Sequence, residues 1–411
     1  MMLTSLRSCG SAAALMFCLH VHLVLGASMK VTSFDGPVTK EELDSFSTYI
    51  ATLQPAKDNV GNSWAQGHSG EETKAMGVVY QISGQQPVLD KMLSYCDAVL
   101  SERNDIAAKP VGQHKIWTGD IAPVWPNDPS TKVIITGGEQ GDPVGHLASC
   151  ANLILGNKAL YNQAVTIGDK NHYGKTYLER AKTYLTQADK SMSGHILPRL
   201  LDLSNGNKMY FSKDSPYKGG QAVPWNQQMM FNYAFQNLVA AHTILGDNPA
   251  LVSKYKSIMT ANLKWFFTGG GSTIKKSKKG NPIYVWNYAM DQNNVEDSNH
   301  ASLDINGFYR AYVDGNWAIT AEQMKPFANV LIDVMTLGNS QYAGTTDGKC
   351  ASGNGICTNY IRSGFLLVSE FRPDQYKAIM GADFKEGGTV GKVDLFSRFL
   401  LVKHRRATAK L

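Results

Sequence analysis

Apolar residues recur along the chain with helical spacing, and the pattern falls into pairs of segments. In each pair a broadly apolar first segment is followed by a turn and by a second segment that is apolar on one face, with Lys and Glu on the other. The pairs span 72–104, 144–192, 226–267 and 300–335, with a shorter fifth at 363–380 and further helical patterns near 39–55 and 393–403. This repetition predicts a series of helical hairpins.

Glycines follow the first helix of four pairs, at Gly84, Gly156, Gly246 and Gly315. A helix commonly ends on a glycine with positive φ, and a second helix that starts soon afterwards runs antiparallel to the first. We therefore expect an all-α fold, an (α/α) toroid of about six hairpins with an inner and an outer ring. An open helical solenoid is the alternative, and the short fifth pair leaves the closure of the ring open.

Polar and aromatic residues gather where the first helices begin. The segments are WAQGHSGEET (64–73), TGGEQGDPVGH (136–146), PWNQQ (224–228), VWNYAMDQNNVEDSNHASLD (285–304) and TNYIR (358–362). The inner helices of a toroid run in one direction, so these segments should meet at one end, where helix N-termini attract carboxylates. The residues expected to contact a substrate are Trp64, Gln66, His68, Glu72, Glu139, His146, Trp225, Gln227, Trp286, Asn299, Asp304 and Tyr309.

His300 is the leading candidate for a catalytic base. Glu296 precedes it by four residues and Asp304 follows it by four, so all three should share one helical face. A carboxylate one turn away orients an imidazole and prepares it to accept a proton. The simpler interpretation of Asp297 is a helix N-cap, and His68 or His146 alone is more typical of a hydrogen-bonded structural histidine.

Residues 1–26 have the features of a secretory signal peptide: Arg7, an apolar stretch and a small-residue region near Gly26. A membrane anchor is the alternative. Residues 27–411 are then expected to form one exported catalytic domain that is free of the membrane. The net charge of +6 from 40 basic and 34 acidic residues is too small to indicate nucleic acid, although it suits an acidic substrate.

The cysteines also fit an exported protein. Cys350 and Cys357 enclose a short loop and are expected to form a disulfide. Cys96 and Cys150 lie within apolar helical patterns and are expected to be buried thiols, with a bridge between them as the alternative. No spacing fits a structural zinc site or a calcium loop, so we expect no metal and no cofactor.

Two reactions suit such a site. Hydrolysis with inversion needs a pair of carboxylates, which Glu72, Glu139, Asp142, Glu296 and Asp304 offer. β-Elimination on a uronate needs a group that neutralises the sugar carboxylate, a base and an acid. Amides, His, Tyr and Arg suit elimination better, and they are present as Asn226 with Gln227, Asn299 with His300, Tyr288, Tyr309, and Tyr360 with Arg362. A toroid that only binds carbohydrate, or a chaperone-like repeat, is the third possibility.

Three segments resemble a pattern in secreted toroidal polysaccharide lyases that act on alginate or β-1,4-glucuronan. They are PWNQQ, YVWNYAMDQNNVEDSNHASLD and YIRSGF, and the most specific of them is 284–304. The resemblance implies an acidic polysaccharide as substrate and His300 as base. It also implies Tyr360 or Tyr288 as acid, with Glu296, Asn226 or Arg362 beside the substrate carboxylate.

Overall fold

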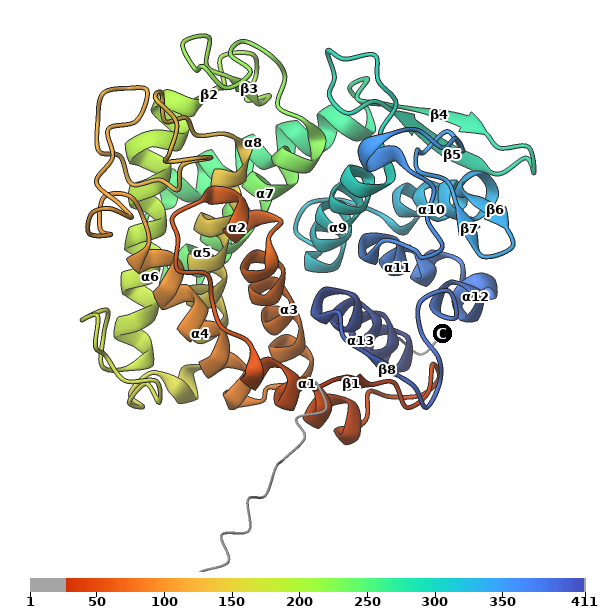
Figure 1. Ribbon diagram of the computed structural model, residues 1–411, viewed down its shortest axis with the longest axis horizontal. Coiled ribbons are helices and arrows are strands. Elements are labelled where there is room, and N and C mark those ends of the chain that lie inside the picture. Colours follow the sequence, from red (N-terminus) through yellow and green to blue (C-terminus); the bar gives the residue numbers. More distant parts are fainter. Residues whose placement is uncertain (1–26, 410–411) are drawn as a thin grey trace, which may run out of the picture.

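The computed structural model describes residues 27–409, and the expected signal peptide at 1–26 lies outside the described residues. Six helices pack side by side in a closed ring, each against the next and α13 against α3 (Figure 1). These inner helices are α3 (His68–Ser83), α5 (Gly141–Leu155), α7 (Trp225–Leu245), α9 (Ser298–Asp314), α11 (Ser363–Leu367) and α13 (Val393–Thr408). The predicted (α/α) toroid is thus confirmed, and the ring closes despite the short α11.

The other helices form an outer layer around this ring. Most follow an inner helix and run back beside it, whereas α1 precedes the ring and covers α3 and α4. They are α1 (Lys40–Thr52), α4 (Gln86–Ser101), α6 (Tyr177–Ser191) continued by η3 (Met192–Leu200), α8 (Pro249–Phe267), α10 (Ala321–Asn329) continued by η4 (Val330–Met335), and α12 (Tyr376–Met380). The short α2 (Gly61–Ala65) and the turns η1 (Gly138–Gln140), η2 (Lys158–Leu160), η5 (Gly353–Gly355), η6 (Val368–Phe371) and η7 (Pro373–Gln375) lie in the connections.

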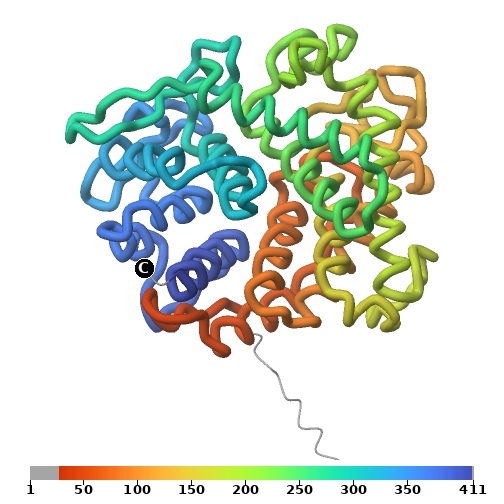
Figure 2. The backbone as a smooth tube through the Cα atoms, turned by 180° about the vertical axis from the view of Figure 1, so that it is seen from behind, coloured from red at the N-terminus to blue at the C-terminus, as the bar shows by residue number. Residues whose placement is uncertain are grey.

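The two ends of the described chain meet and close the ring. Strand β1 (Met29–Lys30) pairs antiparallel with β8 (Thr389–Val390), so red and blue segments lie together in Figure 2. Lys403 on α13 forms a buried salt bridge of 2.8 Å with Glu42 on α1. The sixth pair of inner and outer helices is therefore built from α13 and α1, the last and first helices of residues 27–409.

Strand pairs, which the sequence pattern did not predict, occur in several connections. The longest is the hairpin of β4 (Ser272–Lys276) and β5 (Pro282–Trp286), which projects from the ring (Figure 1). The others are β2 (Leu201–Asp202) with β3 (Tyr210–Phe211), and β6 (Thr336–Gly338) with β7 (Gln341–Tyr342). The segment before His300 is therefore a strand and a turn, and α9 begins only at Ser298.

The glycine caps follow the prediction with one exception. Gly84, Gly246 and Gly315 have φ of 64°, 68° and 73°, and each ends its inner helix. Gly156 has φ of −68°, so the expected left-handed cap is wrong there. Its N–H continues the helical bonding to Asn152, so the chain leaves α5 without a left-handed residue.

Within the part of the chain that the structure describes, two disulfides link helices and loops. Cys350–Cys357 is present as predicted. Cys96 and Cys150 are bonded as well, which corrects the expectation of two free thiols. Their helical patterns indicated burial correctly, but only packing of α4 against α5 brings the two sulfur atoms together. No helix within residues 27–409 combines the length and apolar character that crossing a bilayer requires.

A buried histidine joins the outer and inner layers near the end of α7. Nε2 of His242 lies 2.9 Å from Asp189 on α6, and its Nδ1 lies 2.6 Å from Asp247. Tyr255 on α8 donates to the same Asp189. Burial opposes a charged imidazole, but the bonds to the two carboxylates prevail and raise the pKa of His242.

Candidate active site

The N-terminal ends of the inner helices lie together at one end of the ring, which we call the mouth. Arg362 before α11 donates to Ser298 at the start of α9, and Trp225 at the start of α7 donates to the carbonyl of Tyr288. Lys74 near the start of α3 bonds Asp142 at the start of α5 at 2.6 Å. The polar clusters therefore meet as their positions in the sequence predicted.

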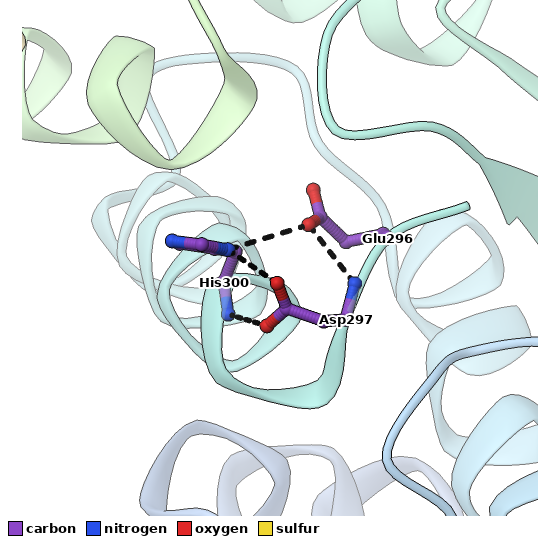
Figure 3. Close-up of side chains that lie close together, drawn as sticks. All are labelled: Glu296, Asp297 and His300. Carbon is purple, nitrogen blue, oxygen red and sulfur yellow. Dashed lines mark hydrogen bonds and ion pairs between the residues drawn. The ribbon is translucent and has the colours of Figure 1, made fainter. Parts of the chain in front are cut away.

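The start of α9 holds His300 through Asp297 (Figure 3). Asp297 Oδ1 caps the helix by accepting from the N–H groups of Asn299 and His300 at 2.9 and 3.0 Å. Its Oδ2 lies 2.6 Å from His300 Nδ1. Burial alone would raise the pKa of Asp297, but the bonds to His300 lower it, so this carboxylate is ionised. An ionised acceptor at Nδ1 assigns the ring proton there and leaves the Nε2 lone pair to accept another.

The carboxylate that orients His300 is thus Asp297, whereas the sequence pattern pointed to Glu296 and Asp304. Glu296 Oε1 lies 3.9 Å from His300 Nδ1, beyond hydrogen-bond distance. Glu296 precedes the helix, and the two predicted carboxylates instead lie against each other. The i+4 spacing correctly brought Glu296 near the imidazole, but the capping residue is closer.

Glu296 and Asp304 form a buried pair of acids beside His300. Both are fully buried, and Asp304 Oδ2 accepts from the indole N–H of Trp286 at 2.9 Å. Burial first, and then the neighbouring charge of Asp304, raises the pKa of Glu296 well above its usual range. Glu296 is therefore the member of the pair that keeps a proton at neutral pH.

Tyr288 stands next to His300, and Lys218 stands next to Tyr288. The rings of Tyr288 and His300 have centroids 4.9 Å apart. Lys218 Nζ lies 3.3 Å from the Tyr288 hydroxyl and 4.7 Å from its ring centre. Burial raises the pKa of Tyr288, so the phenol is protonated at neutral pH. The ammonium donates to the phenol oxygen, which leaves the phenol proton available to another acceptor.

Lys218 is a residue that the sequence did not single out, and its backbone is unusual. Its φ is +50°, in the left-handed region that costs a non-glycine residue free energy. The loop before α7 also supplies Tyr217, whose hydroxyl accepts from Gln227 at 2.7 Å. The sequence YKGG offered only the signal of a tight turn, because nothing local indicates that this loop reaches Tyr288.

Arg362 and Asn299 supply hydrogen-bond donors on the other side of His300. Arg362 Nε bonds Ser298 Oγ at 3.1 Å, and its Nη1 bonds Asn299 Oδ1 at 3.0 Å. Because the guanidinium occupies the oxygen of the amide, the NH₂ group of Asn299 is directed to other acceptors. Both side chains are half-buried, so solvent reaches them.

Three aromatic residues that were expected to stack on sugar belong to the core. Trp64, Trp225 and Trp286 are each at most 2% exposed. Trp225 packs edge-on against Trp265 and Phe266, and Trp286 packs against Phe266. Their positions at the helix starts made both interpretations possible, and the outer layer of helices decides for packing.

Several polar candidates also face away from the mouth or are held by local bonds. Glu72 accepts from Tyr95 on the outer helix α4 at 2.6 Å, and Tyr309 donates to Glu370. Glu139 accepts from the N–H of Gly137 at 2.8 Å. Glu72 and Tyr309 therefore face neighbouring helices, which corrects the expectation that these two line the site, whereas Glu139 lies near Tyr217 in the loop before α7.

The remaining candidates differ in exposure. His146 Nε2 donates to the carbonyl of Trp64 at 2.6 Å, and burial lowers the pKa of His146 to about 3, so it is a neutral structural histidine. His68 is exposed, and Gln66 is half-buried. Asn226 is 1% exposed, and its Oδ1 lacks a hydrogen-bond partner. Tyr360 lies under Lys392, whose ammonium is 4.9 Å from the ring centre.

Glu296, Asp297 and His300 each offer one potential metal ligand, and these atoms lie within 4.8 Å of one another. That spacing would allow one ion to be held. A metal bound at His300 Nδ1 would take the place of the proton that bridges to Asp297. The hydrogen-bonded arrangement and a metal site are therefore alternatives, and the expectation of a metal-independent enzyme stays a prediction.

No family model matches the chain, and no curated protein sequence matches it. In structure the chain is similar to a cellobiose 2-epimerase from Spirochaeta thermophila, with 13% identity, a TM-score of 0.39, and coverage of 82% of this chain and 68% of the epimerase. It is also similar to a glycosyl hydrolase family 88 protein from Bacteroides vulgatus, with 11% identity, a TM-score of 0.39, and coverage of 90% and 99%. At these values we draw no conclusion about the reaction, which is argued from the site.

Proposed function

We propose that the protein is a polysaccharide lyase that cleaves a uronate polymer by β-elimination. His300 Nε2 takes the proton from C5 of the uronate residue, and the C4–O bond breaks. The electron pair of that bond goes to the leaving oxygen, which receives a proton from the Tyr288 hydroxyl. A C4–C5 double bond remains in the new chain end, so protons and electrons balance.

The observation that carries the proposal is that a base, His300, and an acid, Tyr288, lie next to each other and are each held by a different residue. The rings of His300 and Tyr288 lie 4.9 Å apart. Asp297 holds the imidazole with its Nε2 lone pair free, and Lys218 stabilises the phenolate that forms when Tyr288 gives up its proton. Tyr288 is favoured over Tyr360 as the acid, because the ring of Tyr288 contacts the imidazole of His300, whereas the ring of Tyr360 contacts Lys392 and Arg362.

The weak acidity of C5 requires the sugar carboxylate to be neutralised. Arg362, Asn299 and Lys218 offer donors close to His300, and two of them carry a positive charge. Glu296, which the resemblance also placed beside the sugar carboxylate, is fully buried against Asp304 and does not supply such a donor. The donors of Arg362, Asn299 and Lys218 suit a uronate better than a neutral sugar.

Few carboxylates are positioned for the alternative reaction, hydrolysis. Glu296 and Asp304 contact each other and are fully buried, so they do not flank a glycosidic bond. Glu72 faces Tyr95, and Asp142 is paired with Lys74. Four of the five acids expected for hydrolysis are thus engaged elsewhere, which leaves Glu139 without a second carboxylate to complete the pair and favours elimination.

The test is ultraviolet absorbance of the purified protein mixed with glucuronan, polymannuronate, polyguluronate or a neutral β-glucan. We expect absorbance from the C4–C5 double bond with at least one acidic polymer and with no neutral one. His300→Ala and Tyr288→Phe should each lower kcat by about a hundredfold to ten-thousandfold. Tyr360→Phe is the matched control and should keep most of the wild-type kcat.

Two results would overturn the proposal. Reducing ends that appear without the absorbance would indicate hydrolysis. Full activity in His300→Ala would remove the base from the mechanism, whatever the substrate.

A further inference from the structure

A cluster of cations lies inside the ring, below the residues of the proposed mechanism. Arg310 on α9 and Lys74 on α3 both lie over the ring of Tyr233 on α7, at 4.6 and 5.6 Å from its centre. Burial lowers the pKa of Arg310, and Arg398 on α13 is close enough to add to that effect. Three inner helices therefore bring three positive charges to one region, around an aromatic ring from a fourth.

Among the described residues, carboxylates lie near all three cations, but only Lys74 is within salt-bridge distance of one. Asp142 is also near Arg310, and Asp394 and Glu71 are near Arg398. Lys74 forms a salt bridge of 2.6 Å with Asp142. Within residues 27–409 neither arginine forms a salt bridge: Arg310 donates to the carbonyl of Met229 at 3.0 Å, and Arg398 donates to the carbonyl of Asp394 at 2.9 Å. The Nε atoms of both arginines are buried without a hydrogen-bond acceptor.

Such an arrangement is costly unless an acceptor completes it. A buried N–H group without an acceptor costs free energy, and the guanidinium group is suited to bind a carboxylate through two parallel hydrogen bonds. Asp142 Oδ1 is also buried without a partner, so the region is not saturated with hydrogen bonds. These orphan groups point to a ligand.

The cations lie deeper in the ring than the mouth, and two of them keep some exposure to solvent. Arg310 and Lys74 are half-buried although both lie on inner helices, whereas Arg398 is buried. Arg310 is the thirteenth residue of α9, ten residues and about 15 Å along that helix from His300. A ligand that contacts both His300 and these cations must therefore extend from the mouth into the ring.

We propose that Arg310 and Arg398, with Lys74 beside them, form an anion-binding subsite inside the ring that takes the carboxylate of a second uronate residue of the substrate. The identity of the ligand rests on the proposed function, whereas the subsite itself rests on the unpaired guanidinium groups. A polymer with a carboxylate on successive residues would place one at His300 and one at this subsite.

The test is calorimetric binding of a glucuronan tetrasaccharide to full-length His300→Ala protein, in which turnover is suppressed. Arg310→Gln and Arg398→Gln, each added to this protein, should weaken binding by about tenfold to a hundredfold, because each removes a charge-assisted hydrogen bond. Cellotetraose, the neutral counterpart, should bind equally to all variants. Arg199→Gln removes an exposed arginine and is the matched control.

The inference is overturned if Arg310→Gln and Arg398→Gln bind the acidic tetrasaccharide as Arg199→Gln does, or if they lose both oligosaccharides equally. Where a Gln variant does not fold, Arg310→Lys keeps the charge and loses the planar fork, and we expect severalfold weaker binding of the acidic ligand only. Unchanged binding of the acidic ligand in that variant would also overturn the inference. Arginine-dependent binding without any lyase activity would refute the proposed function and leave the subsite standing.

Discussion

Replacing Asp297 by Asn separates two roles of one side chain. Its Oδ1 caps α9 at 2.9 and 3.0 Å, and its Oδ2 accepts from His300 Nδ1 at 2.6 Å. Asn keeps an oxygen for the cap but presents an NH₂ group to the imidazole. That group needs an acceptor, so Nδ1 loses its proton and Nε2 gains one, which removes the base.

The expected magnitudes of the two effects differ. Asn and Asp are about equally good N-caps, so the free energy of unfolding should change by less than about 1 kcal/mol. General base catalysis contributes about a hundredfold to ten-thousandfold, and the wrong tautomer forfeits most of it. Asp297→Asn should therefore lose at least about a hundredfold in kcat while folding normally.

Asp297→Ala is the companion variant. It removes the cap as well, so unfolding free energy should fall by about 0.5–2 kcal/mol, but it imposes no tautomer on His300. We expect it to be less stable than Asp297→Asn and no less active. The assays are double-bond absorbance under saturating substrate and urea unfolding. An Asp297→Asn enzyme with more than a tenth of the wild-type kcat would refute the assignment of His300 as a base held by Asp297.

Three further predictions concern the buried acid pair, the histidine bridge and the disulfides. Glu296→Gln mimics the protonated acid, so kcat should stay within about threefold of wild type. Because folding raises the pKa of Glu296, the free energy of unfolding of the wild type should fall as pH rises above 4.5. Urea unfolding of the variant should show a weaker dependence on pH. The raised pKa of His242 means that its stabilisation is complete below pH 6.5 and is lost as pH rises through the folded value, so His242→Gln should cost about 3 kcal/mol in urea unfolding at low pH and progressively less at high pH. Removing Cys96–Cys150, with a sequence separation of 54, should cost about 4 kcal/mol in the same assay, against about 2 kcal/mol for the separation of 7 in the other disulfide. A cost that is independent of pH for His242→Gln, or equal for the two disulfides, would contradict these arguments.

The sequence alone carried the architecture and the location of the polar mouth. Helical spacing of apolar residues, with Gly84, Gly246 and Gly315 at the turns, is a local property that hairpins inherit directly. Because the inner helices of a closed ring run in one direction, the positions of the polar clusters before them already determined that those clusters would meet. His300 could also be singled out from the sequence, because carboxylate residues lie within about one helical turn of it.

Tertiary structure decided which side chains face that mouth. Glu71 and Glu72 are adjacent in the sequence, yet Glu72 bonds the outer helix α4 whereas Glu71 lies near Asp394 on the inner helix α13. Packing also decided the position of Trp225, which lies against Phe266 of the outer helix α8. Side chains one residue apart on a helix point about 100° apart, so only the packing of the layers selects the inward face.

Nothing in the sequence indicated Lys218, and the Cys96–Cys150 bond was only the alternative to two thiols, for a related cause. Each is a contact between segments far apart in the chain, 70 residues for Lys218 with Tyr288 and 54 for the disulfide. Local periodicity indicates which residues are neighbours within one or two helical turns, but it does not indicate where a loop lies in the folded protein. The closure of the ring decides that, because it brings all the loops before the inner helices to one end.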